Sequence, residues 1–376
     1  MTALPIPTEA DWHWHAVSNA FWCLDQASGI VLALLVLATG LGVRMTSALR
    51  ARGWRPAAGA AACFALYFAV DRLLHAIVDV AWDGAHDRAL GRASPSAAEW
   101  WLGQLGGLVV GCLVLVALAL LLRAVAVRAP RRGWIAVGGV AFALGAAAMI
   151  AQPLATPATP LDDGPTEQAL AAVAMQAGVP RERLFERHCE PATSCSGGEV
   201  VGVGPTRRVL LNVDLLKTLP LPWARQTMAH EAHHEIADDN LRALPVLAAL
   251  ALLAAWIALR ATDRLARRHA RRLGFDSVAA PAALPLAMLL LTVAWIALQP
   301  PLNVWRQHVE LEADHFALQT TGDAAAQAAM MAHFADQPGR LPQPSRFYQL
   351  FRDGHPSDAE RVRLADDFAG THTAPN

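Results

Sequence analysis

The sequence predicts a mainly α-helical membrane protein with six transmembrane helices and a small α+β domain. The chain has 376 residues, 54% of them hydrophobic, and these gather in long apolar runs that are typical of membrane proteins. Its polar residues concentrate in two stretches, 153–240 and 300–376. The formal net charge is only -1, and the arginines occur in short blocks, so nucleic acid is not an expected partner. No Lys or Arg precedes the first apolar run, so no cleavable signal peptide is expected.

Six apolar segments are long enough to cross a hydrocarbon core of about 30 Å. These segments lie at 19–43, 56–82, 101–122, 133–152, 243–259 and 280–299. The predicted organisation therefore has four parts. They are a membrane region with four transmembrane helices (1–152), the first part of a polar domain (153–240), a two-helix transmembrane hairpin (241–299) and the second part of the polar domain (300–376).

Arginine is distributed unevenly among the loops between these segments. The loops at 44–55, 123–132 and 260–272 are rich in Arg, whereas the loop at 83–100 has only two arginines. Because cytoplasmic loops carry the excess of positive charge, the three Arg-rich loops are predicted to be cytoplasmic. Both polar regions then lie on the outer face, which in a bacterium is the periplasmic side of the inner membrane.

The second segment carries ionisable residues on one helical face. Asp71, His75 and Asp79 follow one another at intervals of four, with Arg72 adjacent. Ionisable groups inside a bilayer are costly and normally face a partner or a watery cavity. The pattern favours a water-filled chamber or polar pairing between helices. A shifted segment whose polar residues reach the interface is the alternative.

Two cysteines lie close together in the first polar region, in "HCEPATSCSGG". An oxidising outer compartment would allow Cys189 and Cys195 to form a disulfide. Two unpaired thiols remain open, since sequence alone does not establish a bridge.

The stretch "MAHEAHHEIADDN" carries the strongest chemical signal. His230 and His234 are four residues apart, so on a helix their imidazoles project from one face and can bind one metal ion. Glu231 follows the first histidine, where its carboxylate can accept a proton from water at the metal. This is the HExxH arrangement of zinc peptidases. The alternative is the charged face of a solvated helix.

A catalytic zinc ion usually has three protein ligands and a water, so a third ligand has to come from elsewhere. In "WRQHVELEADHFAL", Glu310 and Asp314 share a helical face, and Glu312 points roughly the opposite way. Glu310 is predicted to bind zinc, and Asp314 to orient a ligand histidine. Asp239 is a second candidate for that orienting role, and Asp314 as the third ligand is the alternative assignment. The two segments between His234 and Glu310 return the chain to the same face, so the two halves of the site can meet.

Near the end of the chain, "DGHPSDAERVRL" supplies two further candidates. His355 could donate to the oxyanion of a tetrahedral intermediate, and Arg361 could hold a carboxylate or a substrate carbonyl. Considered alone, both could equally be surface residues.

Together these motifs resemble the integral-membrane gluzincin peptidases, the family of the CAAX prenyl endopeptidase and the heat-shock protease HtpX. The resemblance covers about 164–361 and rests on "HEAHHEIADD", two apolar segments, "ELEAD", "HPSDAER" and "VVGVGPTRRVLLNVDLL". It implies a zincin-like (gluzincin) domain with one catalytic Zn²⁺. It also implies that His355 acts on the oxyanion with Arg361 as its companion.

The resemblance further implies an edge strand that binds a peptide substrate through its main chain. The residues of that strand are Glu199, Val200, Val201, Gly202 and Val203. The sequence departs from the family at positions that flank this groove, so specificity is not carried over. The departures are Ala232 and His233 for Leu-Gly, Gly197 to Glu199 for Asn-Ala-Tyr, Val213 and Asp214 for Asp-Thr, and Arg306 and Gln307 for Ser-Arg. The prenyl endopeptidase also has one more span before its metal helix and a site that faces the cytoplasm.

The expected function is that of a membrane-embedded zinc endopeptidase acting on membrane-associated or membrane-adjacent proteins. Its expected partners are a peptide or protein substrate and the lipid bilayer. Two alternatives are a membrane sensor that uses a metalloprotease domain for signalling and an inactive zinc-binding scaffold.

Overall fold

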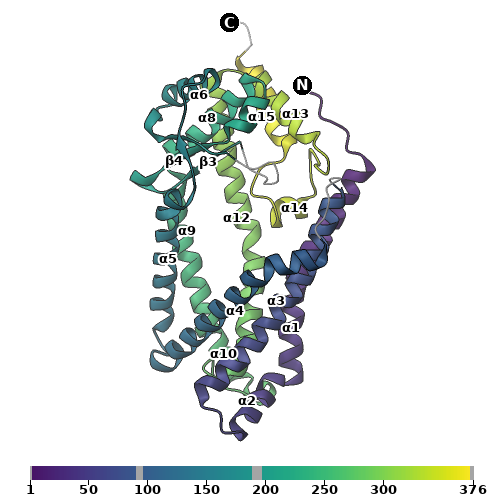
Figure 1. Ribbon diagram of the computed structural model, residues 1–376, viewed down its shortest axis with the longest axis vertical. Helices are drawn as coiled ribbons and strands as arrows, with labels where there is room; N and C mark the ends of the chain where they lie inside the picture. The colour runs from purple at the N-terminus through teal and green to yellow at the C-terminus, as the bar shows by residue number, and fades with distance from the viewer. Residues whose placement is uncertain (1, 90–95, 189–196, 373–376) are drawn as a thin grey trace. The chain divides into compact units, whose positions relative to one another are not determined.

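The computed structural model describes residues 2–89, 96–188 and 197–372 (Figure 1). The chain divides into two compact units. The first comprises Met1–Trp12, Ala143–Leu247 and Gln299–Asn376, and the second comprises His13–Phe142 and Ala248–Leu298. Cys189 and Cys195 lie outside the described residues.

Six helical stretches within the described ranges are long and apolar enough to cross a membrane, by length and composition. The expected class, a mainly α-helical membrane protein with six transmembrane helices and a small α+β domain, is confirmed. The helices that form these stretches are α1 (Glu9–Thr39), α3 (Pro56–Ala89), α4 (Ala97–Arg128), α5 (Gly133–Ala155), α9 (Asp239–Trp256) with its continuation, and α12 (Leu284–Thr321).

The helical stretches extend beyond the predicted segments, as the first and the fifth illustrate. Helix α1 begins at Glu9, ten residues before the predicted start at 19, and ends at Thr39. Gly40, with φ 64°, separates it from the short helix α2 (Leu41–Ala51). The fifth stretch runs over Asp239–Arg268, because α9 continues through a π-helical turn, η3 (Ile257–Ala261), into α10 (Thr262–Arg268). A fifth segment that looks short by hydropathy is therefore 30 helical residues long.

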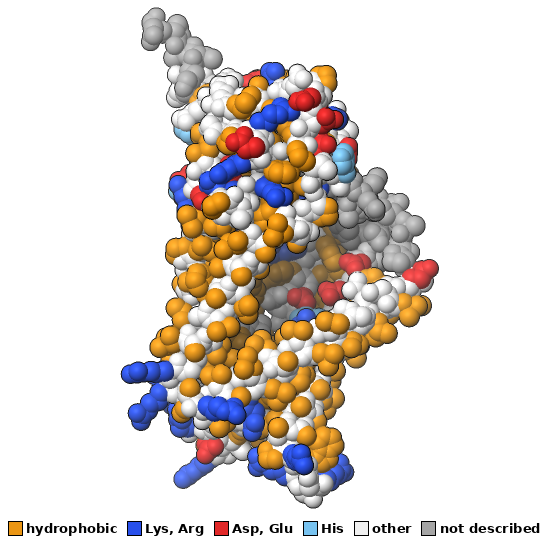
Figure 2. Space-filling model, turned by 60° about the vertical axis from the view of Figure 1, so that its left-hand side comes forward, with side chains coloured by type: hydrophobic (Ala, Val, Ile, Leu, Met, Phe, Trp, Pro, Cys, Tyr) orange, Lys and Arg blue, Asp and Glu red, His pale blue; other side chains and the backbone are white. Residues whose placement is uncertain are grey.

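The second unit collects basic side chains at one of its ends. The Arg-rich loops lie around α2 and α10, and Figure 2 shows Lys and Arg gathered at this end, next to a face covered by hydrophobic side chains. The remaining short elements of this unit are α11 (Ala270–Leu273) and η4 (Pro281–Ala283). The three loops thus share one end, as a common cytoplasmic location requires.

The ionisable residues of α3 pair with a residue on α1. His75 Nδ1 lies 2.5 Å from Asp25 Oδ1, and His75 Nε2 lies 3.7 Å from Asp71 Oδ1. Asp71 is 4% exposed and accepts a hydrogen bond from Arg72, whereas Asp79 is exposed. Polar pairing between helices, one of the interpretations of the sequence, is what the structure shows, beside a cavity of about 320 Å³.

The first unit is built on a four-stranded sheet of order β1-β2-β4-β3. Strand β1 (Thr159–Pro160) is antiparallel to β2 (Leu184–Glu186), β2 is parallel to β4 (Arg208–Leu211), and β3 (Gly198–Val201) is antiparallel to β4. Strand β3 contains part of the expected edge strand. Strands β1 and β2 were not predicted, because two or three residues are too few to show an alternating pattern.

Helices of the first unit cover this sheet. Helix α6 (Pro165–Gln176) ends before Gly178, whose φ of 95° favours glycine. Helix α8 (Leu221–Ala237) packs with α6 on a core that includes Leu170, Leu211 and Met228, all fully buried. Burial of each such side chain stabilises the fold by about 1.5–3 kcal/mol. The other elements of this unit are η1 (Arg181–Arg183), η2 (Gly204–Thr206), α7 (Val213–Thr218), α13 (Ala324–Ala335), α14 (Arg346–Phe351) and α15 (Asp358–His372).

Candidate metal centre and cleft

Helix α8 directs the HExxH residues into the cavity because its opposite face packs in the hydrophobic core. Pro222 stands in the first turn, where a missing N–H costs nothing. Ala224, Met228 and Ala232 are fully buried against the core. The remaining face therefore carries His230 and His234 side by side, one turn apart.

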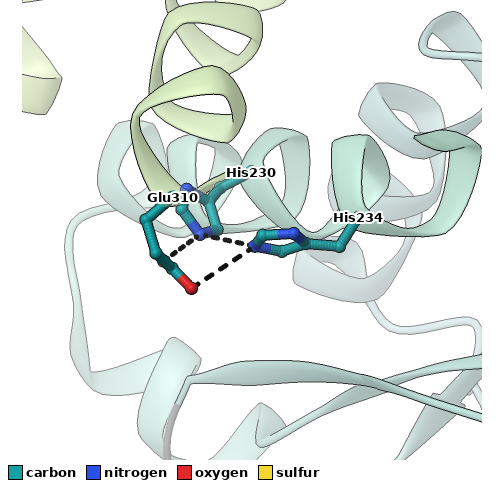
Figure 3. A group of neighbouring side chains, drawn as sticks. All are labelled: His230, His234 and Glu310. Carbon is teal, nitrogen blue, oxygen red and sulfur yellow. Dashed lines mark hydrogen bonds and ion pairs between the residues drawn. The ribbon is translucent and has the colours of Figure 1, made fainter. Parts of the chain in front are cut away.

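Glu310 on α12 reaches the same point as these two imidazoles (Figure 3). His230 Nε2 lies 3.1 Å from His234 Nε2 and 3.3 Å from Glu310 Oε2. His234 Nε2 lies 4.0 Å from Glu310 Oε1. His230, His234 and Glu310 can thus each offer one donor atom, and these atoms lie within 4.8 Å of one another.

The spacing of these atoms fits a tetrahedral metal ion. Ligand atoms about 2.0–2.2 Å from zinc at tetrahedral angles lie about 3.3–3.6 Å from one another. The separations of His230 Nε2 from His234 Nε2 and from Glu310 Oε2, 3.1 and 3.3 Å, are close to that spacing. Two imidazoles and one carboxylate are the donor set of a group of catalytic zinc sites. The residues present therefore fit a divalent ion.

Asp314 lies behind His230 and not among these three donors. Its Oδ1 accepts a hydrogen bond from His230 Nδ1 at 3.0 Å and one from Gln327 Nε2 at 3.2 Å. Both of its oxygens accept from Arg361, at 2.5 and 2.6 Å. The geometry favours Glu310 as the third donor and Asp314 as the residue that orients the His230 ring.

His234 has an equivalent carboxylate partner in Asp239. His234 Nδ1 lies 2.8 Å from Asp239 Oδ2, although a residue five positions along a continuous helix would point elsewhere. The contact exists because Asp238 adopts a left-handed conformation, φ 51°, which ends α8 and turns the chain back. Arg207 holds that turn by donating to the carbonyl of Glu235 at 2.6 Å and pairing with Asp238 at 3.1 Å.

The two carboxylates next to His230 also set its electrostatics. Burial alone lowers the pKa of an imidazole, but hydrogen bonds with Asp314 and Glu310 outweigh it and raise the pKa of His230 to about 10. The local potential thus favours positive charge, and the same negative surroundings favour a bound cation.

The side chain of Glu231 is buried beside the sheet. It is 8% exposed, and this burial raises the pKa of its carboxyl group. A Cβ atom at Gly198 would lie 2.5 Å from Glu231 Cγ, and Gly198 has no positive φ. Glycine is therefore required here for close approach of the strand to the carboxylate.

His355 faces the same space from the loop after α14. Its Nε2 lies 3.7 Å from Glu310 Oε2, and a hydrogen bond with Asp353 raises its pKa above the ordinary value. A side chain of α12, which the sequence did not single out for this role, holds this loop. Gln307 donates to the carbonyls of Gln349 and Asp353, both at 2.9 Å.

Arg361 lines the cavity, and the substrate contact expected from the sequence stays a prediction. Its guanidinium donates twice to Asp314. Through this pair Arg361 would also position Asp314, and through Asp314 the ring of His230.

The expected edge strand is shorter than predicted. It begins at Gly198 and ends at Val201, because Gly202 has φ 85° and the chain then turns into η2. Glu199 and Val200 line a cavity of about 620 Å³ together with His230, Glu231 and Glu310. Val201, Gly202 and Val203 are buried and do not line it. Asn240 donates to the carbonyls of Val200 and Gly202, at 3.2 and 2.9 Å, and thereby fixes the strand beside α9.

His233 stands where the resemblance implies a glycine, and it does not belong to the potential metal-binding group that includes Glu310. Its ring packs on Phe316 with centroids 5.4 Å apart, and burial lowers its pKa. His233, His234 and Asp239 form a second group within metal-binding distance. That group shares His234 and Asp239 with the contact already described, so it is not an independent site.

An HExxH helix and a carboxylate from a second helix, in a chain with six potential membrane spans, define the class of membrane metallopeptidases. A model of peptidase family M48 matches residues 160–369, which is more than half of the chain. The protein therefore belongs to peptidase family M48. The family resemblance expected from the motifs is confirmed.

Two further proteins are similar to this chain, one in sequence and one in structure. The "Uncharacterized metalloprotease YhfN" of Bacillus subtilis (strain 168) is 23% identical over 218 residues, which cover 58% of this chain and 51% of that protein. The chain thus spans about half the length of this curated relative. The crystal structure of Ste24p from S. mikatae is similar with a TM-score of 0.71 at 15% identity, over 97% of this chain and 92% of that chain. At this identity the likeness concerns the fold.

Proposed function

We propose that the protein is a zinc-dependent endopeptidase that hydrolyses peptide bonds of membrane-associated or membrane-adjacent proteins. The observation that carries the proposal is the convergence of His230, His234 and Glu310 on one ion-sized space with Glu231 beside it. Membership of a peptidase family supports the same chemistry.

Five side chains would divide the work of hydrolysis. His230, His234 and Glu310 would hold Zn²⁺, whose Lewis acidity acidifies water and polarises a peptide carbonyl. Glu231 would take a proton from the attacking water and return it to the leaving nitrogen. A raised pKa suits Glu231 to this exchange, because a base with a pKa nearer neutrality can also act as the acid. His355 would donate a hydrogen bond to the oxygen on which negative charge develops.

Strand β3 would align the substrate. It is the last strand on its side of the sheet in the described part of the chain, and its residues line the cavity that holds the metal donors. A peptide added to such an edge is bound by main-chain hydrogen bonds, which do not depend on side-chain identity. The residues proposed to do this are Glu199 and Val200, with Val201, Gly202 and Val203 maintaining the course of the strand.

Removal of the metal tests this proposal directly. Treatment with a chelator is expected to abolish cleavage of a quenched fluorescent peptide, and one equivalent of Zn²⁺ should restore it. Mg²⁺ should not, because it prefers an octahedral shell of oxygen ligands. The same titration should raise the melting temperature, since an ion that binds the folded state stabilises it. Full cleavage by protein that contains no metal by elemental analysis would refute the mechanism.

We further propose that the metal centre lies on the face of the membrane opposite the Arg-rich loops, which in a bacterium is the periplasmic side. Positive charge at one end of the second unit supports this orientation. The proposed domain limits, 153–240 and 300–376 on that face with 1–152 and 241–299 in the membrane, depend on the same assignment.

Cysteine labelling in intact cells checks the orientation. In a variant whose native cysteines are replaced by serine, Asp162→Cys is expected to react with a membrane-impermeant maleimide. Arg268→Cys in an Arg-rich loop is the matched control and should react only after permeabilisation. Both residues are exposed. The reverse pattern would place the metal centre in the cytoplasm.

A further inference from the structure

Arg306 is a cation in the cleft that the proposed chemistry does not use. It lies on α12 four residues before Glu310 and therefore on the same helical face, about 5–6 Å away between Cβ atoms. Its side chain is exposed, and it lines the cavity of about 620 Å³ that also contains His230 and His355.

A glycine leaves room for its guanidinium. A Cβ atom at Gly354 would lie 2.6 Å from Arg306 Cζ and 2.7 Å from its Nε. Gly354 is buried and has no positive φ, so its backbone conformation does not require glycine. The absent side chain instead leaves room for the guanidinium, which rests against the backbone next to His355.

Other charged groups of the cleft already have partners. Arg361 is paired with Asp314, and His355 with Asp353. The carboxylates are engaged as well, Glu199 by Arg187 and Asp239 by His234. None of the ion pairs found among residues 2–89, 96–188 and 197–372 includes Arg306. An unpaired guanidinium therefore faces the space that a substrate would occupy.

We propose that Arg306 binds a carboxylate of the substrate, within about two residues of the scissile bond. The inference rests on the proposed peptidase function and adds its substrate class, peptides that are anionic next to the cleavage point. A guanidinium matches a carboxylate with two parallel hydrogen bonds. An extended peptide advances about 3.3 Å per residue, so one helical turn from Glu310 corresponds to the first or second residue from the bond that is cut. The carboxylate belongs either to a Glu or Asp side chain or to the C-terminus.

Matched peptides measure this preference. The probe is a quenched fluorescent peptide with neutral residues, compared with versions carrying Glu or Gln at each of two positions on either side of the cleaved bond. Each version is made with a free and an amidated C-terminus, which separates the two sources of carboxylate. The parent protein is expected to cleave the best anionic peptide with a kcat/KM at least about tenfold above its neutral counterpart.

Variants of the full-length protein assign the preference to Arg306. Arg306→Gln should remove the difference through KM, with kcat for the neutral peptide unchanged, and Arg306→Glu should favour Lys at the same position. Arg225→Gln is the matched control, since Arg225 is an exposed arginine on α8 outside the cavity. Gly354→Ala should reduce the preference while Arg306 is retained. Equal cleavage of Glu and Gln peptides by the parent, or a preference that persists in Arg306→Gln, would overturn the inference.

A binding measurement separates this inference from the proposed function. Zn²⁺-loaded Glu231→Gln protein, which should not cleave, is titrated with the labelled peptides and followed by fluorescence anisotropy. Tighter binding of anionic peptides that is lost in the double variant with Arg306→Gln supports the inference even if no peptide is hydrolysed. Absence of cleavage by the parent would count against the peptidase function, and equal binding of all peptides would count against Arg306.

Discussion

Replacing Glu231 with glutamine is expected to lower kcat for peptide hydrolysis by about a thousandfold or more, with zinc content unchanged. A general base contributes about 10²- to 10⁴-fold, and Glu231 is proposed to serve first as base and then as acid. Glutamine preserves the shape that fits beside Gly198 but accepts no proton. The measurement is kcat on a quenched fluorescent peptide together with elemental analysis of the purified protein.

The matched control is Glu235→Gln, one turn further along α8. Glu235 is buried and pairs with Arg183 and Arg207, so this change should lower the melting temperature and leave kcat near that of the parent. The kcat of His355→Ala should lie between those of these two variants, about 10²- to 10³-fold below that of the parent, because one hydrogen-bond donor to the oxyanion is removed. Equal cleavage by Glu231→Gln and the parent would exclude the mechanism.

Replacing Glu310 with alanine is expected to remove the metal itself. One of three protein donors is lost, and the two remaining imidazoles, 3.1 Å apart at Nε2, cannot complete a closed zinc shell. Zinc per protein should fall from about one to near zero after dialysis against a weak chelator, and cleavage should disappear with it. Glu312→Ala is the control on the same helix, because Glu312 pairs with Arg242 and His308 outside the site.

Changes in the two carboxylates that orient the histidines should weaken zinc binding without abolishing it. Asp314→Asn and Asp239→Asn are each expected to weaken zinc binding by about 10- to 100-fold, as changes in residues that hydrogen-bond to metal ligands do. If Asp314 were instead the third ligand, Asp314→Asn would abolish binding and Glu310→Ala would retain it. The variant that loses more zinc affinity, Asp314→Asn or Glu310→Ala, therefore identifies the third ligand.

Most residues of the candidate metal site could be predicted from local patterns in the sequence. A four-residue interval places His230 and His234 on one face of any helix, and a shared face singles out Glu310 and Asp314 without knowledge of the fold. The even number of apolar segments between the two motifs then allowed the halves to meet. These features depend on helical periodicity and chain parity, which can be read from a single sequence.

Features that depend on packing between distant segments could not be read in the same way. The pairing of His75 with Asp25 requires α1 and α3 to lie together, and nothing local marks Asp25. Strands β1 and β2 are too short to show an alternating pattern of apolar and polar residues. The left-handed Asp238 is an unusual conformation for a non-glycine residue, and only the surrounding contacts with Arg207 make it favourable.

Helix α12 (Leu284–Thr321) is continuous. It contains both Glu310 and an apolar stretch long enough to cross a bilayer. Helix α9 begins one residue after the last turn of α8, so His234 is joined to the fifth span almost as directly. A water-soluble fragment made of the polar regions alone would therefore lack the covalent path that brings the carboxylate to the imidazoles. Measurements of metal affinity have to be made on protein kept in detergent micelles or nanodiscs, and bilayer thickness becomes an experimental variable that could tune the affinity.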